Sequence, residues 1–454
     1  MSDNEVEVDE ELPDELTEAE AEELIDELDA IEAARLERQT DEGAQELRRG
    51  GERELVLTGA QWPEPETDET MIINMGPQHP STHGVLRIMM ELDGETLIRS
   101  KAVIGYLHTG MEKTAEELMY IQGSTNVTRM DYASPLSNEL VFSLATERLL
   151  DIEVPDRAQW IRMLLVELNR ISSHLLFQAT NGMDLGAVSM MLFGWREREE
   201  ALRVLEEITG LRMNHDYIRP GGVAADLPDG WQESVLHLCE LVERGIDDYD
   251  RLLTENPIWQ ERTVGVGTIT TEQCLDLGIT GPILRSTGFP WDLRKEQPYL
   301  KYPEVDFDVV YTENGDVFDR YRIRLFEIAE SIRIVRQCVE KMPPGDYRVQ
   351  DRKVTPPPRA RIDESMEALI HHFKLFTEGF RVPAGETYVA VESPRGEIGC
   401  YIAADGTAKP YRMHIRGPSF YNLQSMGPMV EGAMVAAAVA IVSSIDPILG
   451  EVDR

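Results

Sequence analysis

Two histidines near residue 80 are the first residues in this sequence with a recognisable chemistry. His79 and His83 lie in residues 74–87, NMGPQHPSTHGVLR, and their spacing of four residues would suit a metal pair on a helix. Pro80 stands between them and a glycine flanks each end, so the segment is predicted to be a turn and a metal site is not favoured. A loop histidine can instead donate a hydrogen bond or a proton to a bound oxygen ligand, although an isolated one is more often structural.

The cysteines offer no site for an electron carrier. The four are widely spaced and form no C-x-x-C pair, which excludes a self-contained iron–sulfur or zinc motif of the usual close spacing; they are Cys239, Cys274, Cys338 and Cys400. This pattern also disfavours a disulfide scaffold and is typical of a reducing cytoplasm. No Rossmann G-x-G-x-x-G with a suitable acidic residue follows a strand pattern, so the chain is not expected to carry electrons alone.

The charge of the chain excludes several partners. Lys and Arg total 44 against 83 Asp and Glu, a net charge of −39, and residues 31–454 still carry −24 of it. Such a surface repels nucleic acid and anionic lipid headgroups, so neither is expected to bind directly. Abundant carboxylates with scarce lysine also suggest a halophile, in which salt screens the exposed charges; the alternative is a mesophilic protein with an acidic tail.

The first part of the chain is expected to be separate from the rest. Residues 1–30 hold 15 acidic side chains and no Lys or Arg, and Gly- and Pro-containing breaks follow before residue 68. We therefore predict that residues 1–68 are an acidic, disordered extension, with a short helix docking on a neighbouring subunit as the alternative. The sequence shows no signal-peptide pattern. Its apolar runs are all much shorter than the about 20 residues that a membrane-spanning helix needs. A soluble or peripheral protein is expected.

Residues 71–454 are predicted to form one α+β domain. Alternation and a turn at Asp93-Gly94 favour a small β-region over 71–110. A helix bundle is predicted for the core at 111–378, because long apolar stripes must pack against each other. Its helices are expected at 156–181, 187–209, 231–254, 317–341 and 362–377. The part from 379 to 454 is predicted to be irregular, with short β-like pieces and a helix at about 429–444.

Several ordered motifs connect the chain with a known family. They include MGPQHPSTHG, GYLHTGMEKTAEE, TRMDY, RISSHLL, MDLGA, YIRPGGVAADLP, GDVFDRYRIR, TPPPR, ESPRGEIG, RGPSFYNLQ and DPILGEVDR. On these motifs the chain resembles the D-subunit family of proton-translocating NADH-quinone oxidoreductase, or respiratory complex I, over residues 71–454. The resemblance implies a subunit that forms most of a quinone-reduction pocket.

The resemblance assigns three site residues. His83 matches the histidine that hydrogen-bonds one carbonyl of the quinone headgroup, and Tyr132, in RMDY, matches the tyrosine that bonds the other. Two opposed proton donors would stabilise the negative charge that develops on both quinone oxygens. Asp184, in GMDLGA, matches the carboxylate that orients His83 and raises its basicity. Taken alone, Asp184 would be read as a helix-end cap.

The same family is related to the large subunit of nickel–iron hydrogenases, so a hydrogenase-like fold is implied. Those enzymes hold the metals with R-x-C-G-x-C and D-P-C-x-x-C. At the four cysteine positions this chain has Asp131, Ser134, Ile448 and Glu451. Because such a site requires soft thiolates, hydrogenase activity is excluded, and no metal is expected on this chain.

The resemblance also implies the cofactors and partners. Complex I subunits B, C, H and I would be the neighbours, electrons would come from a 4Fe–4S cluster in the small B subunit, and the quinone tail would leave toward the membrane-embedded H subunit. NAD would bind elsewhere in the complex. The chain would then lie peripherally on the cytoplasmic side of the cell membrane. Two alternatives remain: the same role in a complex fed by reduced deazaflavin or ferredoxin, and a non-catalytic structural paralogue, which loss of His83 or Tyr132 would indicate.

A few residues carry weaker expectations. Many family members have a histidine where this chain has Asn214, which puts proton coupling near the cluster in doubt; His215 is adjacent. Arg395 lies in a Gly-rich segment and is expected to contact another subunit. His371 and His372 are predicted to be surface or interface residues on a helix.

Overall fold

The computed structural model describes residues 70–76 and 84–454. The predicted acidic extension at 1–68 and both His79 and His83 lie outside the described residues. The remaining chain is mixed α+β and mostly helical, with small antiparallel sheets, which confirms the predicted fold class at that level.

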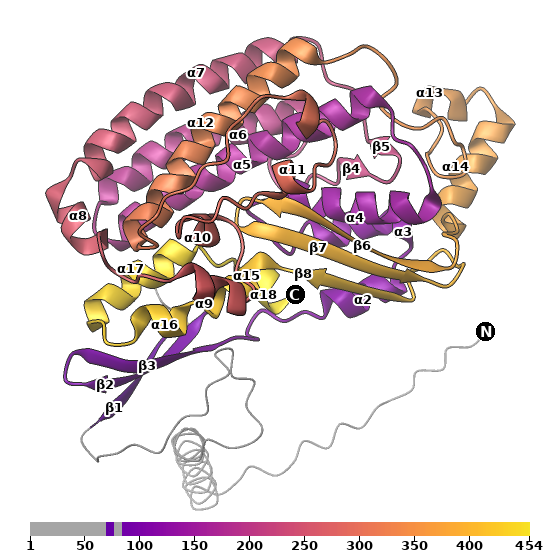
Figure 1. Ribbon diagram of the computed structural model, residues 1–454. Coiled ribbons are helices and arrows are strands. Elements are labelled where there is room, and N and C mark those ends of the chain that lie inside the picture. Colours follow the sequence, from indigo (N-terminus) through magenta and orange to yellow (C-terminus); the bar gives the residue numbers. More distant parts are fainter. Residues whose placement is uncertain (1–69, 77–83) are drawn as a thin grey trace, which may run out of the picture. The chain divides into compact units, whose positions relative to one another are not determined.

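Four long helices form the helical layer (Figure 1). Its central member is α5, Asp156–Asp184, which packs against α6, Val188–Thr209, and α12, Val317–Lys341. The outer helix α7, Trp231–Tyr249, packs on α6 and continues as the π-helix η1, Asp250–Thr254. The predicted ranges 156–181, 187–209, 231–254 and 317–341 agree with these elements, because each has an apolar stripe long enough to define it.

The chain after α14, Met366–Glu378, is more regular than predicted. Strands β6, Gly385–Ser393, and β7, Gly396–Ala404, form a long hairpin, and β8, Arg412–Arg416, adds a third antiparallel strand to β7. One helix, α4, Pro135–Leu150, packs on β6 and β7. The prediction of an irregular segment over 379–454 is wrong for this sheet, whose pairing between separate strands gives no local period beyond short alternating pieces.

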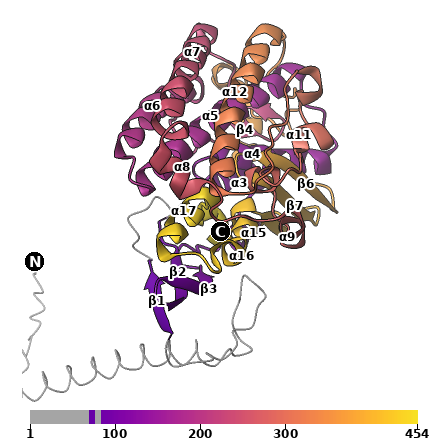
Figure 2. The same cartoon turned by 60° about the vertical axis from the view of Figure 1, so that its left-hand side comes forward.

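The N-terminal sheet lies at the end of the unit away from α7 (Figure 2). Strands β1, Met71–Met75, β2, Arg87–Asp93, and β3, Thr96–Val103, pair antiparallel in that order, and the predicted turn separates β2 from β3. Leu97 exchanges backbone hydrogen bonds of 2.8 Å with residues 432 and 433, so a C-terminal segment extends this sheet edge.

The predicted helix at about 429–444 is divided in the structure. Residues Met426–Val430 form α16, and α17 begins only at Val435 and ends at Ile445. Gly432, between them, has a left-handed φ of 75°. The other elements are short: α2 Met111–Glu117, α3 Tyr120–Val127, β4 Ile218–Arg219, β5 Gly222–Val223, α8 Pro257–Thr263, α9 Thr271–Asp276, α10 Pro282–Arg285, α11 Leu293–Glu296, η2 Tyr302–Glu304, α13 Arg359–Ile362, α14 Met366–Glu378, α15 Pro418–Leu423 and α18 Leu449–Asp453.

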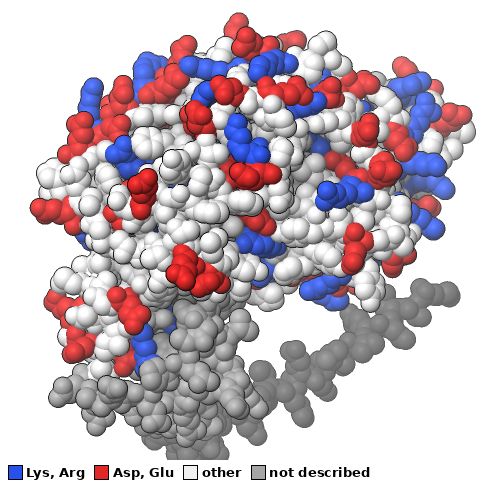
Figure 3. Space-filling model, in the orientation of Figure 1, with Lys and Arg blue, Asp and Glu red and all other residues white. Residues whose placement is uncertain are grey.

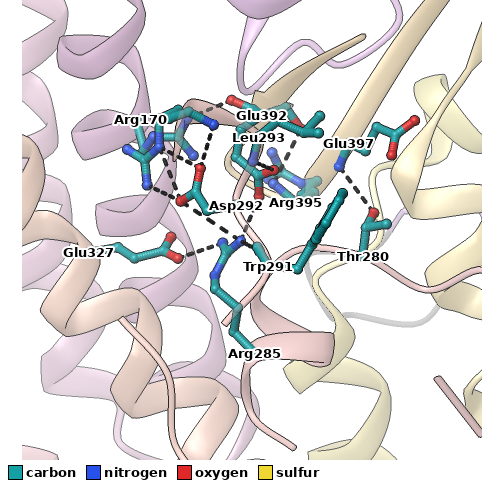
Figure 4. Close-up of polar contacts among 12 residues, drawn as sticks. Arg170, Thr280, Arg285, Trp291, Asp292, Leu293, Glu327, Glu392, Arg395 and Glu397 are labelled. Atoms are coloured by element: carbon teal, nitrogen blue, oxygen red, sulfur yellow. Dashed lines mark hydrogen bonds and ion pairs between the residues drawn. The ribbon is translucent and has the colours of Figure 1, made fainter. Parts of the chain in front are cut away.

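A buried ionic network joins the helical layer to the β6–β7 sheet (Figure 4). Arg285 is fully buried and donates to Glu327 on α12 at 2.6 Å and to Glu392 on β6 at 2.7 Å. Close by, Arg294 pairs with Asp292 at 2.7 Å and with Glu167 on α5 at 3.2 Å. Each carboxylate therefore has a guanidinium partner in the interior, where an unpaired charge would be strongly unfavourable.

The network sets the charge states of its members. Burial alone would raise the pKa of Glu327, but Arg285 and the hydrogen bond from His174 hold it well below its usual value. Burial lowers the pKa of His174 to about 4, so its imidazole is neutral at pH 7 and donates from Nε2 to Glu327 at 2.8 Å. Glu327 is therefore an ionised carboxylate with a guanidinium on one oxygen and a neutral imidazole on the other.

We predict that Arg285→Met lowers the free energy of unfolding by about 3–5 kcal/mol, because it leaves Glu327 and Glu392 buried without their cation. Chemical denaturation of both proteins measures this difference. The control is Arg333→Met on α12, whose partners Asp306 and Asp308 are exposed; its midpoint should match that of the wild type. Equal midpoints for all three proteins would contradict the prediction.

Candidate active site

Tyr132 lies in the loop between α3 and α4, against the C-terminal end of the chain. Gly450 of α18 approaches this loop so closely that an added Cβ would be 2.5 Å from the carbonyl oxygen of Met130 and 3.3 Å from Cδ1 of Tyr132. Any larger residue at position 450 would displace the loop. The close approach places the two stretches RMDYAS and DPILGE side by side.

Arg395 fixes this loop from a third direction. It stands in the turn between β6 and β7, is 1% exposed, and its Nη1 donates to Asp131 Oδ2 at 3.0 Å and to Ser173 Oγ at 3.1 Å. Its Nε donates to the carbonyl oxygen of Asp446 at 3.1 Å, and Nη2 lies 3.1 Å from Asp446 Oδ2. One guanidinium therefore connects the Tyr132 loop, α5 and the end of α17.

This arrangement corrects the expectation that Arg395 contacts another subunit. The residue is buried because its hairpin turn points into the core, and a second close approach permits this: a Cβ at Gly281 would lie 2.4 Å from the Arg395 carbonyl oxygen. Sequence reasoning missed Arg395 because a Gly-rich setting is also typical of a surface loop. The available signal was an arginine in a two-residue hairpin turn preceded by β-alternating residues.

Tyr132 is suited to donate a proton. Its side chain is half-buried, and burial together with the carboxylate of Asp131 raises the pKa of Tyr132 above its ordinary value. Its hydroxyl is therefore protonated at neutral pH. Within residues 70–76 and 84–454 that hydroxyl has no hydrogen-bond partner, so it can donate to a ligand without breaking a bond in the protein.

A second carboxylic acid lies behind the tyrosine loop. Glu451 is fully buried; its Oε2 accepts from the Ser419 backbone N–H at 3.1 Å, and its Oε1 has no partner among the described residues. Burial and the nearby Asp131 raise the pKa of Glu451 to about 8, against the opposing effects of Ser419 and Arg395. Burial also raises the pKa of Asp131, with Arg395 acting against the shift. At neutral pH Glu451 is mostly a neutral acid.

Asp184 is the last residue of α5 and is half-buried. One turn earlier, Asn181 Oδ1 accepts a hydrogen bond of 2.8 Å from Ser443 Oγ on α17. The helix α17 ends at Ile445, directly before the Asp446 that binds Arg395. The segment 443–446 therefore connects the end of α5 that carries Asp184 with the loop that carries Tyr132. His83, the third predicted residue, lies outside the described residues.

The four residues that the sequence analysis compared with hydrogenase cysteines do not suit a soft metal pair. Asp131, Ser134, Ile448 and Glu451 are all buried, and none offers a thiolate. Across the described ranges no group of three or more His, Cys, Asp or Glu side chains could hold a metal ion. The four cysteines are buried and unpaired elsewhere in the fold.

His215, the residue next to Asn214, is held by contacts within the chain. The ring of His215 is buried, and its Nδ1 lies 2.9 Å from both Thr209 Oγ1 and the Leu211 carbonyl oxygen. Burial lowers the pKa of His215 to about 4, so it is neutral and bonded within its own loop. The sequence expectation of weakened proton coupling at this point stays a prediction.

Comparison with known proteins identifies the family. The family model described as respiratory-chain NADH dehydrogenase, 49 Kd subunit, matches residues 184–454. A relative from Salinispora arenicola, named as a D subunit (D 1) of NADH-quinone oxidoreductase, is 50% identical over 436 residues, which cover 92% of this chain and 98% of the relative. The D subunit of Mycobacteroides abscessus is 52% identical over 424 residues, 88% of this chain and 98% of the relative. This chain belongs to that family.

Membership in the D-subunit family makes the chain a subunit of an NADH-quinone oxidoreductase, as the sequence motifs predicted. Among the described residues no helix is both long enough and apolar enough to cross a membrane. Tyr132 and the buried cluster of Asp131, Arg395 and Asp446 beside it therefore belong to a chain of the D-subunit family.

The raised pKa of Glu451 predicts a pH dependence of stability. The pKa of the Glu451 carboxyl is 4.5 in the unfolded chain and about 8 in the native one. Between these values only the native state keeps the proton, so the free energy of unfolding falls as pH rises, by about 1.4 kcal/mol per pH unit, and is constant above this window. Glu451→Gln removes this loss.

The difference in thermal midpoint, Glu451→Gln minus wild type, should therefore increase from pH 5 to pH 8, a window of about three units. The matched control is Glu431→Gln at an exposed position, whose difference should be flat. A flat difference for Glu451→Gln as well would mean that this carboxyl titrates normally in the folded chain.

Proposed function

We propose that this chain forms, together with an iron–sulfur subunit, the site at which quinone is reduced in a membrane-associated, proton-translocating NADH-quinone oxidoreductase. The observation that carries the proposal is the unpartnered Tyr132 hydroxyl, held by the Asp131–Arg395–Asp446 cluster in a chain of the D-subunit family. Relatives at half identity over nearly their full length are named as subunits of that enzyme.

Quinone reduction adds two electrons and two protons, and the charge develops on oxygens at opposite ends of one ring. In the proposed site Tyr132 donates to one oxygen and His83 to the other. Because the Tyr132 loop is fixed by buried ion pairs before any ligand binds, little reorganisation accompanies the reaction. Asp184 is proposed to orient His83 and to stabilise its protonated form.

The proposal includes the surroundings of the chain. Electrons would arrive from a 4Fe–4S cluster in the B subunit, and subunits C, H and I would be the other neighbours, with the H subunit providing the route to the membrane. NAD would bind elsewhere, and the chain itself would hold no metal. Reduced deazaflavin or ferredoxin could replace NADH as the donor without any change in this chain, and purified complex assayed with each reductant would distinguish them.

Three further proposals rest on the sequence. The domain from 71 to 454 is proposed to share the fold of the nickel–iron hydrogenase large subunit, supported by the juxtaposition of the RMDYAS and DPILGE stretches through Gly450. Residues 1–68 are proposed to be a separate acidic extension. The net charge of −39 supports a halophilic source.

Tyr132→Phe tests the proposed donor. It removes only the hydroxyl and should lower the rate of quinone reduction about 10²–10³-fold, the usual loss for one transition-state donor. The assay is inhibitor-sensitive quinone reduction by the purified complex, normalised to its subunit content. Tyr411→Phe, the same change at an exposed tyrosine, is the control and should leave the rate unaltered. Wild-type turnover in an assembled Tyr132→Phe complex would overturn the assignment.

Asp184→Asn tests the proposed carboxylate. An amide cannot stabilise a protonated imidazole, so a smaller fraction of His83 would be charged at neutral pH and quinone reduction should slow. The loss should shrink at acidic pH, where protonation is recovered, and His83→Ala should abolish that pH dependence. Rates are compared across pH at fixed high salt. An equal loss at every pH would show that Asp184 acts through packing instead.

A further inference from the structure

A basic segment stands out in this acidic chain. Between α12 and α14, residues 348–361 contain five Lys or Arg and one acidic residue, whereas the whole chain has 44 basic and 83 acidic residues. Figure 3 shows basic side chains at this edge of the molecule, where Figure 1 places α13 and α14. The quinone-site proposal does not involve this edge.

Three of these arginines line one pocket. Arg348, Arg352 and Arg361 surround a cavity of about 330 Å³, within the size range of small binding sites. Its walls are fixed: the backbone N–H of Val349 donates to Gly221 at 2.7 Å, and Tyr347 accepts from Val223 at 3.1 Å. The other lining residues include Gln350, Pro356, Pro357, Pro358, Ala368 and His371.

The guanidinium groups of Arg348, Arg352 and Arg361 are unpaired. Throughout residues 70–76 and 84–454 no carboxylate and no hydrogen-bond acceptor contacts any of them, and Arg348 only overlies the Tyr347 ring, with its Cζ 5.3 Å from the ring centroid. Some other surface arginines are paired, as Arg336 is with Glu243 at 2.7 Å. Three unpaired guanidiniums around one fixed cavity make a site for carboxylate or another oxyanion.

Helix α14, which forms one wall of the pocket, also exposes an apolar face on its other side. Ala368 and His371 face the pocket, and helical geometry turns a row of large apolar residues away from it. Their exposed fractions are high: Met366 78%, Leu369 50%, Ile370 50%, Phe373 66% and Phe376 46%. An apolar face of this kind marks a surface that another molecule covers.

We propose that the pocket binds a carboxylate-bearing segment of another protein chain. Charge complementarity supports a single carboxylate, because the three guanidiniums and the carboxylates of Asp346 and Glu367 leave one net positive charge at the pocket. A doubly charged phosphate fits less well, because Asp346 and Glu367 also line the pocket. A membrane-surface helix would be rich in Lys and Arg, whereas α14 has one Lys and two Glu in a strongly acidic chain.

Photo-crosslinking in the intact complex tests this proposal. A p-benzoylphenylalanine replaces Gln350, which is exposed and uncharged and lines the pocket, and mass spectrometry identifies the crosslinked peptide. We expect a peptide of another subunit that contains Asp or Glu. Adding Arg352→Gln and Arg361→Gln should lower the yield about tenfold, because two charge-assisted hydrogen bonds are lost.

The matched control carries Lys353→Gln and Arg359→Gln, which remove the same charge from neighbouring positions that do not line the pocket. Its crosslinking yield should equal that of the parent. Equal losses in both pairs, a crosslink to lipid, or no crosslink to protein would overturn the proposal. So would competition by millimolar inorganic phosphate at constant ionic strength. Quinone reduction at the wild-type rate in the pocket variants would show that the pocket is independent of the proposed quinone site.

Discussion

Ionised side chains in the interior are the constraint on which the rest of this structure depends. A buried guanidinium or carboxylate without a counter-charge is so unfavourable that the segments carrying the two charges must meet. Arg285 ties α10 to α12 and β6, and Arg294 ties α11 to α5. These contacts are directional, unlike apolar packing, and they fix how the β6–β7 hairpin sits against the helical layer.

The same constraint reaches the candidate active site through Arg395. Because the β6–β7 hairpin is fixed at Glu392, its turn presents Arg395 to Asp131 and Asp446 in one geometry. The adjacent Tyr132 is thereby positioned by buried ion pairs that lie behind it. The charged cluster of Asp131, Arg395 and Asp446 lies beside Tyr132, and the loop also borders a neutral acid, Glu451.

Charge is distributed very differently inside and outside the fold. Several interior guanidiniums meet carboxylates, as Arg285 and Arg395 do, whereas Arg320 and Arg324 donate to backbone carbonyls. The whole chain has a net charge of −39. In so acidic a chain, three arginines without a carboxylate partner around one pocket stand out. The pocket at residues 346–371 gathers three such arginines, which supports the proposed contact with an acidic segment.

The sequence by itself determined the long helices, the α+β class, the absence of a thiolate site and the family. Helix periodicity is a local property: residues 317–341 were predicted and form α12 with those bounds. The family motifs also predicted His83, Tyr132 and Asp184 as site residues, and this stays a prediction. Only the tertiary structure decided that Arg395 is a core residue 264 positions from Asp131, that Glu451 is a buried neutral acid, and that three strands between residues 385 and 416 form a sheet. These features depend on partners distant in the chain, and no local pattern of residues encodes which distant charge or strand will be met.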